Sequence, residues 1–453
     1  MDDHTEYKLA FILPESRQLL GIQNSGDIEL PRISVPMWQR PAEQLTRLIE
    51  ETWNIRTLVL DLLCDSPIST PCAVIEVRSS SWQFTRRGLT TVHLGNIGRL
   101  SLSGDERAAL LSILSGSNTS RSPFARIGWI NEAQEWIHTA IRDHDVIFTD
   151  EMRHLNAGGE FCLLRLGTIA GPAYWLKAVG RPNAHEFGVT AYLAAVCPEY
   201  LPPILAIRAD WRAWLMEEYG TSLHSSSSLE HFKRAASNLA NLQIRLIGRS
   251  ADLLGAGCGD HSIGVLRSHI DNIIEYLDCA MSQRTSTKVP PLPASRLNEI
   301  GRILHEACSA MEDLNIPDSL MHNDISPGSI LTNGSDCVFT DWCEAYVGNP
   351  FITLEQLCVH ASRKSESSQY WSSALKDVYR SVWVENLTEH QVERALQLAP
   401  LLSVLSYLHG RGDWLEPSRR TQPAFLSYSR SLARHMDRIA NSAELREALC
   451  QFK

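Results

Sequence analysis

A change in hydrophobic pattern near residue 220 constrains the fold of this 453-residue chain more than any other feature. Residues 146–218 carry short apolar runs separated by turn residues, which is typical of strands. Beyond them, apolar residues recur every three or four positions, which is typical of amphipathic helices. The clearest of these helices cover residues 229–247, 262–281 and 295–314. A strand block followed by a helical block predicts an α+β protein with two lobes, a small β-rich lobe over 124–219 and a large helical lobe over 220–453.

The first 118 residues predict a separate α/β domain ahead of the small lobe. Its predicted elements are a hairpin over residues 9–22, two further strands over 57–63 and 72–77, and two amphipathic helices over 42–53 and 105–114. The predicted inward positions of the two helices are Leu45, Leu48, Ile49 and Thr52, and Leu110, Leu111 and Leu114. The serine-rich segment 115–123 is typical of a linker and closes this domain.

Composition narrows the class of protein. Lys and Arg number 42 against 52 Asp and Glu, a net charge of -10, which argues against general nucleic-acid binding by a basic surface. The polar, acidic start predicts no export signal, and no apolar run reaches the ~20 residues of a membrane helix. Eleven scattered cysteines without a Cys-x-x-Cys pair predict reduced thiols. We expect a cytoplasmic protein with no nucleic-acid or membrane partner. The sequence does not indicate its oligomeric state.

Two aspartates stand beside short apolar runs in the most informative stretch of the chain. Asp324 lies in the segment 320–331, which reads LMHNDISPGSIL, and Asp341 follows the run 337–340. Either residue alone would be interpreted as a turn or capping carboxylate, because Asp is common in loops. The order and spacing of the two aspartates are a more specific signal of function than a lone His-x-Asp motif would be.

This stretch resembles the catalytic loop and the metal-binding aspartate of the aminoglycoside phosphotransferase (APH) and choline kinase family. The resemblance implies a bilobal protein-kinase-like fold, with ATP and Mg²⁺ as cofactors. It also implies that Asp324 is the catalytic base, that Asp341 binds Mg²⁺, and that His322 is a structural residue of the loop.

The upstream half carries features where such a kinase has its nucleotide site. The turn 155–160 separates two strand-like runs, and its glycines let the backbone approach phosphates closely. A single lysine lies on the apolar strand 173–178, a glutamate opens the helix 186–195 to pair with it, and the segment 214–220 links the lobes. The implied nucleotide contacts are Asn156, Gly158, Gly159, Lys177, Glu186, Met216, Glu217 and Tyr219.

Two positions depart from the family pattern. Ser329 replaces the asparagine that binds a second Mg²⁺, and a serine hydroxyl is a shorter and weaker ligand. Ser326 replaces a basic or imidazole side chain, so less positive charge faces the transferred phosphoryl group. Both substitutions keep open the alternative that the chain is a kinase without activity.

The amino-terminal domain resembles a Nudix hydrolase whose catalytic box is degenerate. Only the helical carboxylate pair Glu50-Glu51 matches the box, whereas Arg32 and Trp38 stand where it needs glycine and glutamate. With so few ligands, metal-assisted hydrolysis is not expected. We interpret the domain as a non-catalytic Nudix-like fold for binding or packing; alternatively, the pair is simply a solvated helix face.

The function predicted from the sequence is ATP- and Mg²⁺-dependent phosphorylation of a hydroxyl on a small molecule. By resemblance, the acceptor is an antibiotic, natural product, sugar or amino alcohol, bound on the helical lobe over 222–281 and from 344 onwards. The alternative is a non-catalytic pseudokinase with a Nudix-like domain that binds a ligand or serves as a scaffold.

Overall fold

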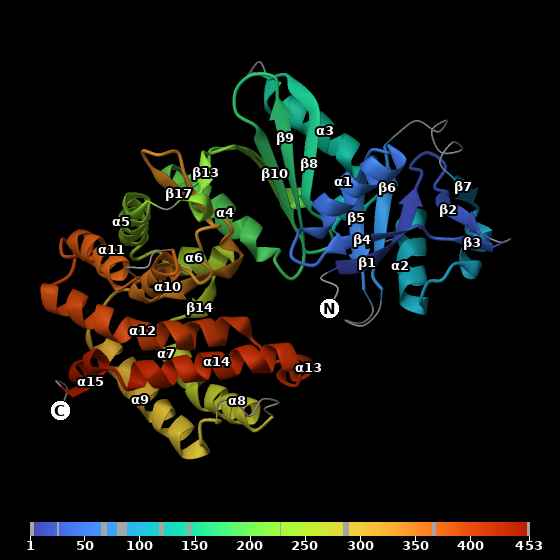
Figure 1. The fold of residues 1–453 in the computed structure, drawn as a ribbon. Coiled ribbons are helices and arrows are strands. Elements are labelled where there is room, and N and C mark those ends of the chain that lie inside the picture. The colour runs from blue at the N-terminus through green and yellow to red at the C-terminus, as the bar shows by residue number, and fades with distance from the viewer. Residues whose placement is uncertain are drawn as a thin grey trace. The chain divides into compact units, whose positions relative to one another are not determined.

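The computed structural model describes residues 4–24, 27–64, 70–78, 88–116, 122–142, 146–226, 228–283, 290–364 and 368–450. These residues form a mixed structure of helices and sheets, as the sequence predicts (Figure 1). The chain divides into two compact units. Unit 1 comprises residues 1–187 and 203–218, and unit 2 comprises 188–202 and 219–453. Most of the predicted linker 115–123 lies outside the described residues.

The first sheet of unit 1 has seven strands in the described residues, in the order β3-β2-β1-β6-β5 with β4 on β1 and β7 on β2. The strands are β1 (His4–Ile12), β2 (Leu19–Asn24), β3 (Asp27–Glu29), β4 (Arg32–Pro36), β5 (Thr57–Leu63), β6 (Cys72–Val77) and β7 (Leu89–Val92). The predicted hairpin is confirmed, with Phe11 opposite Leu20. Strands β1 and β6 are parallel, and the other pairs are antiparallel.

Two helices accompany this sheet, α1 (Pro41–Trp53) and α2 (Gly104–Ser115), and both were predicted. Their inward faces differ in part from the prediction. Thr52 is exposed because α1 buries positions 42, 45, 49 and 53. Leu111 is also exposed, because the buried face of α2 comprises positions 106, 110, 113 and 114, so Leu110 and Leu114 are buried as predicted and Leu111 lies just beyond the edge of that face.

The second sheet of unit 1 is the predicted strand block, and it is antiparallel throughout, in the order β11-β12-β10-β9-β8. Its strands are β8 (Phe148–Asn156), β9 (Phe161–Thr168), β10 (Tyr174–Val179), β11 (Ile204–Arg208) and β12 (Ala213–Glu217). Helix α3 (Trp129–Ala140) precedes it, and α4 (His185–Val196) follows β10.

One apolar core joins the two sheets of unit 1. Its buried members come from both sheets and from α3, and include Ile12, Leu60, Val74, Trp129, Ile137, Leu164, Leu176 and Leu215. Trp129 is fully buried and packs edge-on against Phe124 and Trp211, with ring centres 6.1 and 5.6 Å away. Helix α3 therefore supplies the apolar surface that both sheets share.

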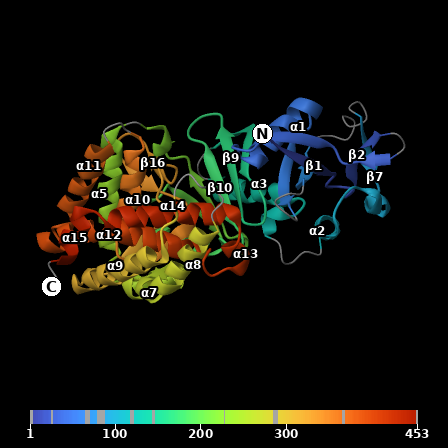
Figure 2. The same cartoon turned by 60° about the horizontal axis from the view of Figure 1, so that its bottom comes forward.

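Unit 2 is mainly helical. Its principal helices are α5 (Leu229–Arg245), α6 (Ser250–Ala256), α7 (Ile263–Ser268), α8 (Ile270–Ser282), α9 (Ala294–Asp313), α10 (Phe351–Ser362), α11 (Ser368–Trp383), α12 (Glu389–Arg411), α14 (Pro423–Ala440) and α15 (Ala443–Cys450). Helices α12 and α14 lie side by side in both views (Figures 1 and 2). The predicted helix 262–281 is two helices, because the backbone at His269 leaves the helical region with φ -108° and ψ 1°.

Two small sheets of unit 2 carry the chemistry-bearing segments. One contains β13 (Thr221–Ser222), β16 (Ile330–Thr332) and β17 (Cys337–Phe339), and the other β14 (Gly259–His261), β18 (Ala345–Gly348) and β15 (Ser319–His322). No disulfide joins any of the eleven cysteines, all of which lie within the described residues. None of the helices in the described part of the chain combines the length and apolar composition needed to cross a membrane.

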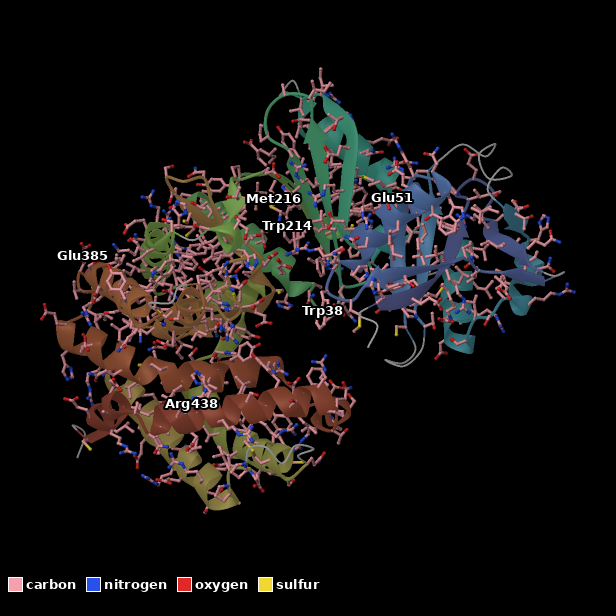
Figure 3. All side chains as sticks on the ribbon, in the orientation of Figure 1. Trp38, Glu51, Trp214, Met216, Glu385 and Arg438 are labelled. Atoms are coloured by element: carbon pink, nitrogen blue, oxygen red, sulfur yellow. The ribbon has the colours of Figure 1, made fainter. Side chains whose placement is uncertain are left out.

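We expect Trp129→Ala to destabilise unit 1 by about 3–5 kcal/mol, because it leaves a large void where the two sheets share their core. The free energy of unfolding, measured by urea denaturation, tests this. The matched control is Trp38→Ala, since Trp38 is 82% exposed (Figure 3). Equal stability of the two variants would show that α3 does not hold the sheets together.

Candidate functional site

The loop between β15 and β16 presents Asp324 in unit 2. Strand β15 is fully buried and paired with β18, so the loop starts from a fixed edge. At that edge, His322 Nε2 donates a hydrogen bond to the carbonyl of Thr340 at 3.0 Å, because a carbonyl can only accept. The His322 ring also lies 4.8 Å from that of Trp342. His322 therefore ties the loop of Asp324 to the segment that carries Asp341.

Ser329 closes this loop on itself. Its hydroxyl accepts from the backbone N–H of Ser326 at 3.0 Å, and it lies 2.9 and 3.2 Å from the carbonyls of Ser326 and Asp324. The side chain is only 3% exposed. A hydroxyl has one proton and two lone pairs, so these contacts leave one lone pair for another partner. The predicted role of Ser329 as a Mg²⁺ ligand stays a prediction.

Asn323, beside the predicted base, is anchored from two helices. It is 1% exposed, and its Oδ1 accepts from Gln356 on α10 at 2.9 Å and from Ser406 on α12 at 3.2 Å. Its backbone N–H donates to the carbonyl of Glu344 at 2.8 Å. These bonds fix the backbone from which Asp324 projects.

The same network continues into a pair of histidines. The hydroxyl of Ser406 lies 2.9 Å from Nδ1 of His261, whose Nε2 lies 3.0 Å from Nδ1 of His409. The His261 ring stacks on Tyr346 with centres 3.6 Å apart. This network was not predicted from the sequence. The one feature of the sequence that hints at it is Ser406, a polar residue inside an apolar helical run.

Two carboxyl groups near the loop have raised pKa values, and burial is the main cause of both shifts. Partial burial raises the pKa of Asp324, and Asp341 adds to this, while His322 and His360 act in the opposite direction. Burial and then Asp324 raise the pKa of Glu344, against the effect of Arg411. Burial is thus the main reason that both carboxyl groups hold a proton more readily than free carboxyl groups do. Sequence reasoning did not assign Glu344 or His360 a role in this site.

The backbone of Asp341 is in the left-handed region, with φ 64° and ψ 57°, at the start of the 3₁₀ turn Trp342–Glu344. Aspartate tolerates this conformation better than most residues, but it still costs conformational energy. The side chain is exposed. Within the described residues, no cluster of three or more His, Cys, Asp or Glu has the geometry of a metal site.

Lys177 and Glu186 form a buried ion pair in unit 1. Strand β10 places Lys177 inside the sheet, and its Nζ lies 2.6 Å from Oε1 of Glu186, with side chains 6% and 2% exposed. The ammonium also lies 5.8 and 5.7 Å from the ring centres of Phe161 and Trp214. Trp214 lies near Met216 on β12 (Figure 3). The pairing is the one the sequence predicts; contact of either residue with nucleotide stays a prediction.

The glycine turn between β8 and β9 is held by residues outside its own sheet. Arg40, ahead of α1, donates to the side chain of Asn156 at 3.0 Å, and the hydroxyl of Ser122 donates to the carbonyl of Gly159 at 2.7 Å. Gly158 has φ +116°, which favours glycine. A Cβ at Gly180 would lie 2.0 Å from the Gly159 carbonyl, so this position needs glycine too. Phosphate contact by this turn stays a prediction.

The predicted hinge uses two of its backbone groups internally. The N–H of Glu217 donates to Pro203 at 2.9 Å, and that of Glu218 to Ala173 at 2.8 Å. The Glu218 carboxylate accepts two bonds from Arg165, at 2.7 and 2.9 Å, and these lower its pKa. Adenine recognition through Met216, Glu217 or Tyr219 stays a prediction and would need their other groups.

The helical pair Glu50-Glu51 faces solvent. Glu51 is 57% exposed and bonds to Arg47 at 2.6 Å, whereas Glu50 is 56% exposed and lies 3.8 Å from Arg56 (Figure 3). The geometry is that of a solvated helix face carrying ion pairs. The Nudix-like identity of this part of the chain stays a prediction.

Neither a family model nor a curated protein matches this chain. A choline/ethanolamine kinase family protein from Mesorhizobium loti is similar in structure at 16% identity, with a TM-score of 0.47 over 71% of this chain and 98% of that one. An ethanolamine kinase from Plasmodium vivax has 14% identity and a TM-score of 0.46, over 78% and 99%. A macrolide 2'-phosphotransferase from Brachybacterium faecium has 14% identity and a TM-score of 0.43, over 66% and 97%. Similarity at this level assigns the chain no activity.

We expect Lys177→Met to lower the free energy of unfolding of unit 1 by about 3–5 kcal/mol, because it removes the ammonium group that neutralises the buried carboxylate of Glu186. The double variant Lys177→Met/Glu186→Leu should recover most of this loss, since no charge is then left buried. Urea denaturation of both variants measures the difference. A double variant as unstable as the single one would contradict this account.

We also expect stability to fall as pH drops from about 6.5 towards 4. Burial lowers the pKa of His261 to about 3 and that of His409 to about 4. An unfolded histidine titrates near 6.5, so the unfolded chain binds more protons in this window and stability rises with pH. His409→Gln should reduce the difference in Tm between pH 7 and pH 5, whereas the exposed control His390→Gln should not. An unchanged slope in His409→Gln would refute the assignment.

Proposed function

We propose that this chain is a small-molecule kinase of the aminoglycoside phosphotransferase and choline kinase type, which transfers the γ-phosphoryl group of ATP to a hydroxyl. The observation that carries the proposal is the 3.0 Å bond from His322 to Thr340, which ties the loop of Asp324 to the segment of Asp341. A base and a metal ligand must be held together in this reaction, because catalysis depends on positioning and charge. The proposal is supported by the types of residue at these positions and by their order along the sequence.

In the proposed reaction Asp324 is the general base. The acceptor oxygen bonds to the γ-phosphorus, the bond from phosphorus to the bridging oxygen of ADP breaks, and the acceptor proton passes to the Asp324 carboxylate and then to solvent. The raised pKa of Asp324 suits this role, since an effective base titrates nearer the working pH than a free aspartate does. Asn323, held by Gln356 and Ser406, keeps the base in place.

The donor set fits Mg²⁺ in chemistry. Asp341 offers an exposed carboxylate, and the hydroxyl of Ser329 keeps one lone pair. Asp341, with Ser329, would hold the ion, which when bound neutralises charge on the ATP phosphates. In unit 1, Lys177 would supply a further positive charge to the phosphates, with Glu186 fixing its position.

The charges around Asp324 are mixed. Glu344 and His360 interact with it electrostatically, and Arg411 acts on Glu344. A polycationic acceptor would need a strongly acidic surface. The mixed charge supports a neutral or singly charged acceptor among the antibiotics, natural products, sugars and amino alcohols.

The second candidate function is that of a pseudokinase that binds a ligand or partner without phosphoryl transfer. One observation favours it: groups predicted to contact nucleotide or metal already have internal partners. Asn156 is bonded to Arg40, the N–H of Glu217 to Pro203, and the Ser329 hydroxyl to its own loop. Activity and nucleotide binding separate the two candidates.

Asp324→Asn should lower kcat by about 10²- to 10⁴-fold while ATP affinity stays within a few fold, because the base acts in the transition state. Asp341→Asn should instead weaken the Mg²⁺-dependent binding of ATP. Transfer of labelled phosphate from ATP to a panel of alcohols, with calorimetric ATP titrations, measures both. Asp377→Asn, at a 61% exposed site on α11, is the matched control.

Wild-type turnover in Asp324→Asn would remove this residue from the mechanism. If the wild-type chain binds ATP but transfers no phosphate to any alcohol or to water, the pseudokinase function replaces the kinase. If it does not bind ATP with Mg²⁺, the kinase function fails, and the pseudokinase function then requires a ligand or partner other than ATP.

A further inference from the structure

A row of polar side chains in unit 2 ends at Asn323, beside the proposed base. We call it the polar row; its members are His409, His261, Ser406 and Asn323, and their polar atoms lie 3.0, 2.9 and 3.2 Å apart in that order. His261, Ser406 and Asn323 are 2%, 0% and 1% exposed. The proposed function uses Ser406 and Asn323 and gives the two histidines no part.

The orientation of the Asn323 amide sets the direction of the hydrogen bonds. Its Nδ2 donates to the backbone carbonyl of Ser406 at 3.4 Å, so its Oδ1 is the atom that faces the Ser406 hydroxyl. A carbonyl oxygen can only accept, so this hydroxyl donates its single proton to Asn323. The hydroxyl must therefore accept from its other neighbour, Nδ1 of His261.

The same reasoning fixes the protons of both histidines. A neutral imidazole carries one N–H, so His261, which donates from Nδ1, accepts at Nε2 from Nδ1 of His409. Burial lowers the pKa of His261 to about 3, and His409 lowers it further. Burial and then His269 lower the pKa of His409 to about 4, against the effect of Asp260. Both rings are therefore neutral near pH 7, with the proton on Nδ1.

Tight packing leaves the His261 ring little freedom to turn. The ring stacks on Tyr346 with centres 3.6 Å apart. On α12, a Cβ at Gly410 would lie 2.8 Å from Nδ2 of Asn323 and 3.2 Å from Cε1 of His261, so a larger residue there would displace them. The position of the proton on His261, and not a movement of the ring, therefore decides how Ser406 meets Asn323.

The other tautomer of His261 would reverse that contact. With the proton on Nε2, Nδ1 would accept, and the hydroxyl of Ser406 would donate to it. The lone pairs of the hydroxyl would then face the Asn323 oxygen, which repels them. The N–H of His409 excludes this tautomer, because it would face a second N–H at 3.0 Å.

We propose that His261 is a positioning residue for the base Asp324, and that His409 holds it in the tautomer in which Ser406 donates to Asn323. The inference rests on the proposed kinase function, in which Asn323 keeps Asp324 in place. His261 acts through Ser406 and does not touch the reacting atoms.

NMR of the full chain, labelled with ¹⁵N in histidine, tests the tautomer without any measurement of activity. The ¹⁵N shifts of a neutral imidazole show which nitrogen carries the proton. At about pH 7, we expect the signals that His261→Phe removes to report a protonated Nδ1 and an unprotonated Nε2. A proton on Nε2 of His261 in the wild-type chain would overturn the proposal.

His261→Phe keeps a ring against Tyr346 but removes both nitrogens. We expect it to lower kcat about tenfold while the KM for ATP stays within about twofold, because a displaced base slows the chemical step and not nucleotide binding. His261→Asn should recover most of the loss, since its amide offers a donor near the position of Nδ1. The matched control is His269→Phe, which should leave kcat unchanged, since His269 packs on His409 but lies outside the polar row.

A double-mutant cycle separates positioning from a general effect on folding. If His261 acts through Ser406, the double variant His261→Phe/Ser406→Ala should be no slower than Ser406→Ala alone. Should His261→Phe not fold, His409→Phe takes its place in the same cycle, because it removes the N–H that holds His261 in its tautomer.

Two results distinguish a failure of this inference from a failure of the kinase function. An active wild-type chain with additive losses in the cycle, or with unchanged kcat in a folded His261→Phe, refutes the positioning role alone. A wild-type chain that transfers no phosphate refutes the kinase function, and the positioning role with it.

Discussion

Unit 2 holds the carboxyl groups of Asp324 and Glu344 partly buried, and burial, more than repulsion between like charges, raises their pKa values. Flexible loops would relax by moving such carboxylates into water. Here the backbone has no such freedom, because buried hydrogen bonds hold each segment. His322 joins the two aspartate segments, and Ser329 closes the loop between β15 and β16. Electrostatic cost at the site is thus balanced by bonds that lie just beneath it.

Unit 1 meets a related cost in a different way. A lysine inside a sheet would lose most of its charged form to desolvation, but Glu186 and two aromatic faces surround Lys177. Such a pair adds little net stability, because desolvation offsets the attraction. The pair therefore fixes the position of a positive charge within an apolar core while adding little to stability.

The sequence predicted those parts of the fold that depend on local pattern. The hairpin at the amino terminus, helix α1 and the strand pair around Asp324 all follow from short-range periodicity and turn residues. The error at Leu111 lies at the edge of a stripe that was otherwise predicted correctly, since Leu110 and Leu114 are buried and the partner surface is distant in sequence. The Lys177 to Glu186 pair was predictable because only nine residues separate its members.

Long-range polar contacts could not be predicted in this way. Ser406 lies 83 residues from Asn323, and its serine character alone does not indicate which buried group it meets. The single core of unit 1 was also not predicted. An apolar residue on α3 gives the same sequence pattern whether it contacts one sheet or two. Contacts of this kind depend on the tertiary arrangement and leave only a weak mark on the local sequence.

The bonds that hold the glycine turn carry an evolutionary consequence. Arg40 and Ser122 lie outside the second sheet, yet they bond to Asn156 at the end of β8 and to Gly159 in the turn that follows it. A recombination event that exchanged the first sheet for an unrelated domain would remove the Arg40 bond to this turn. We therefore expect the two sheets of unit 1 to be inherited together. We also expect substitutions at Arg40 and Asn156 to occur together among descendants of this chain.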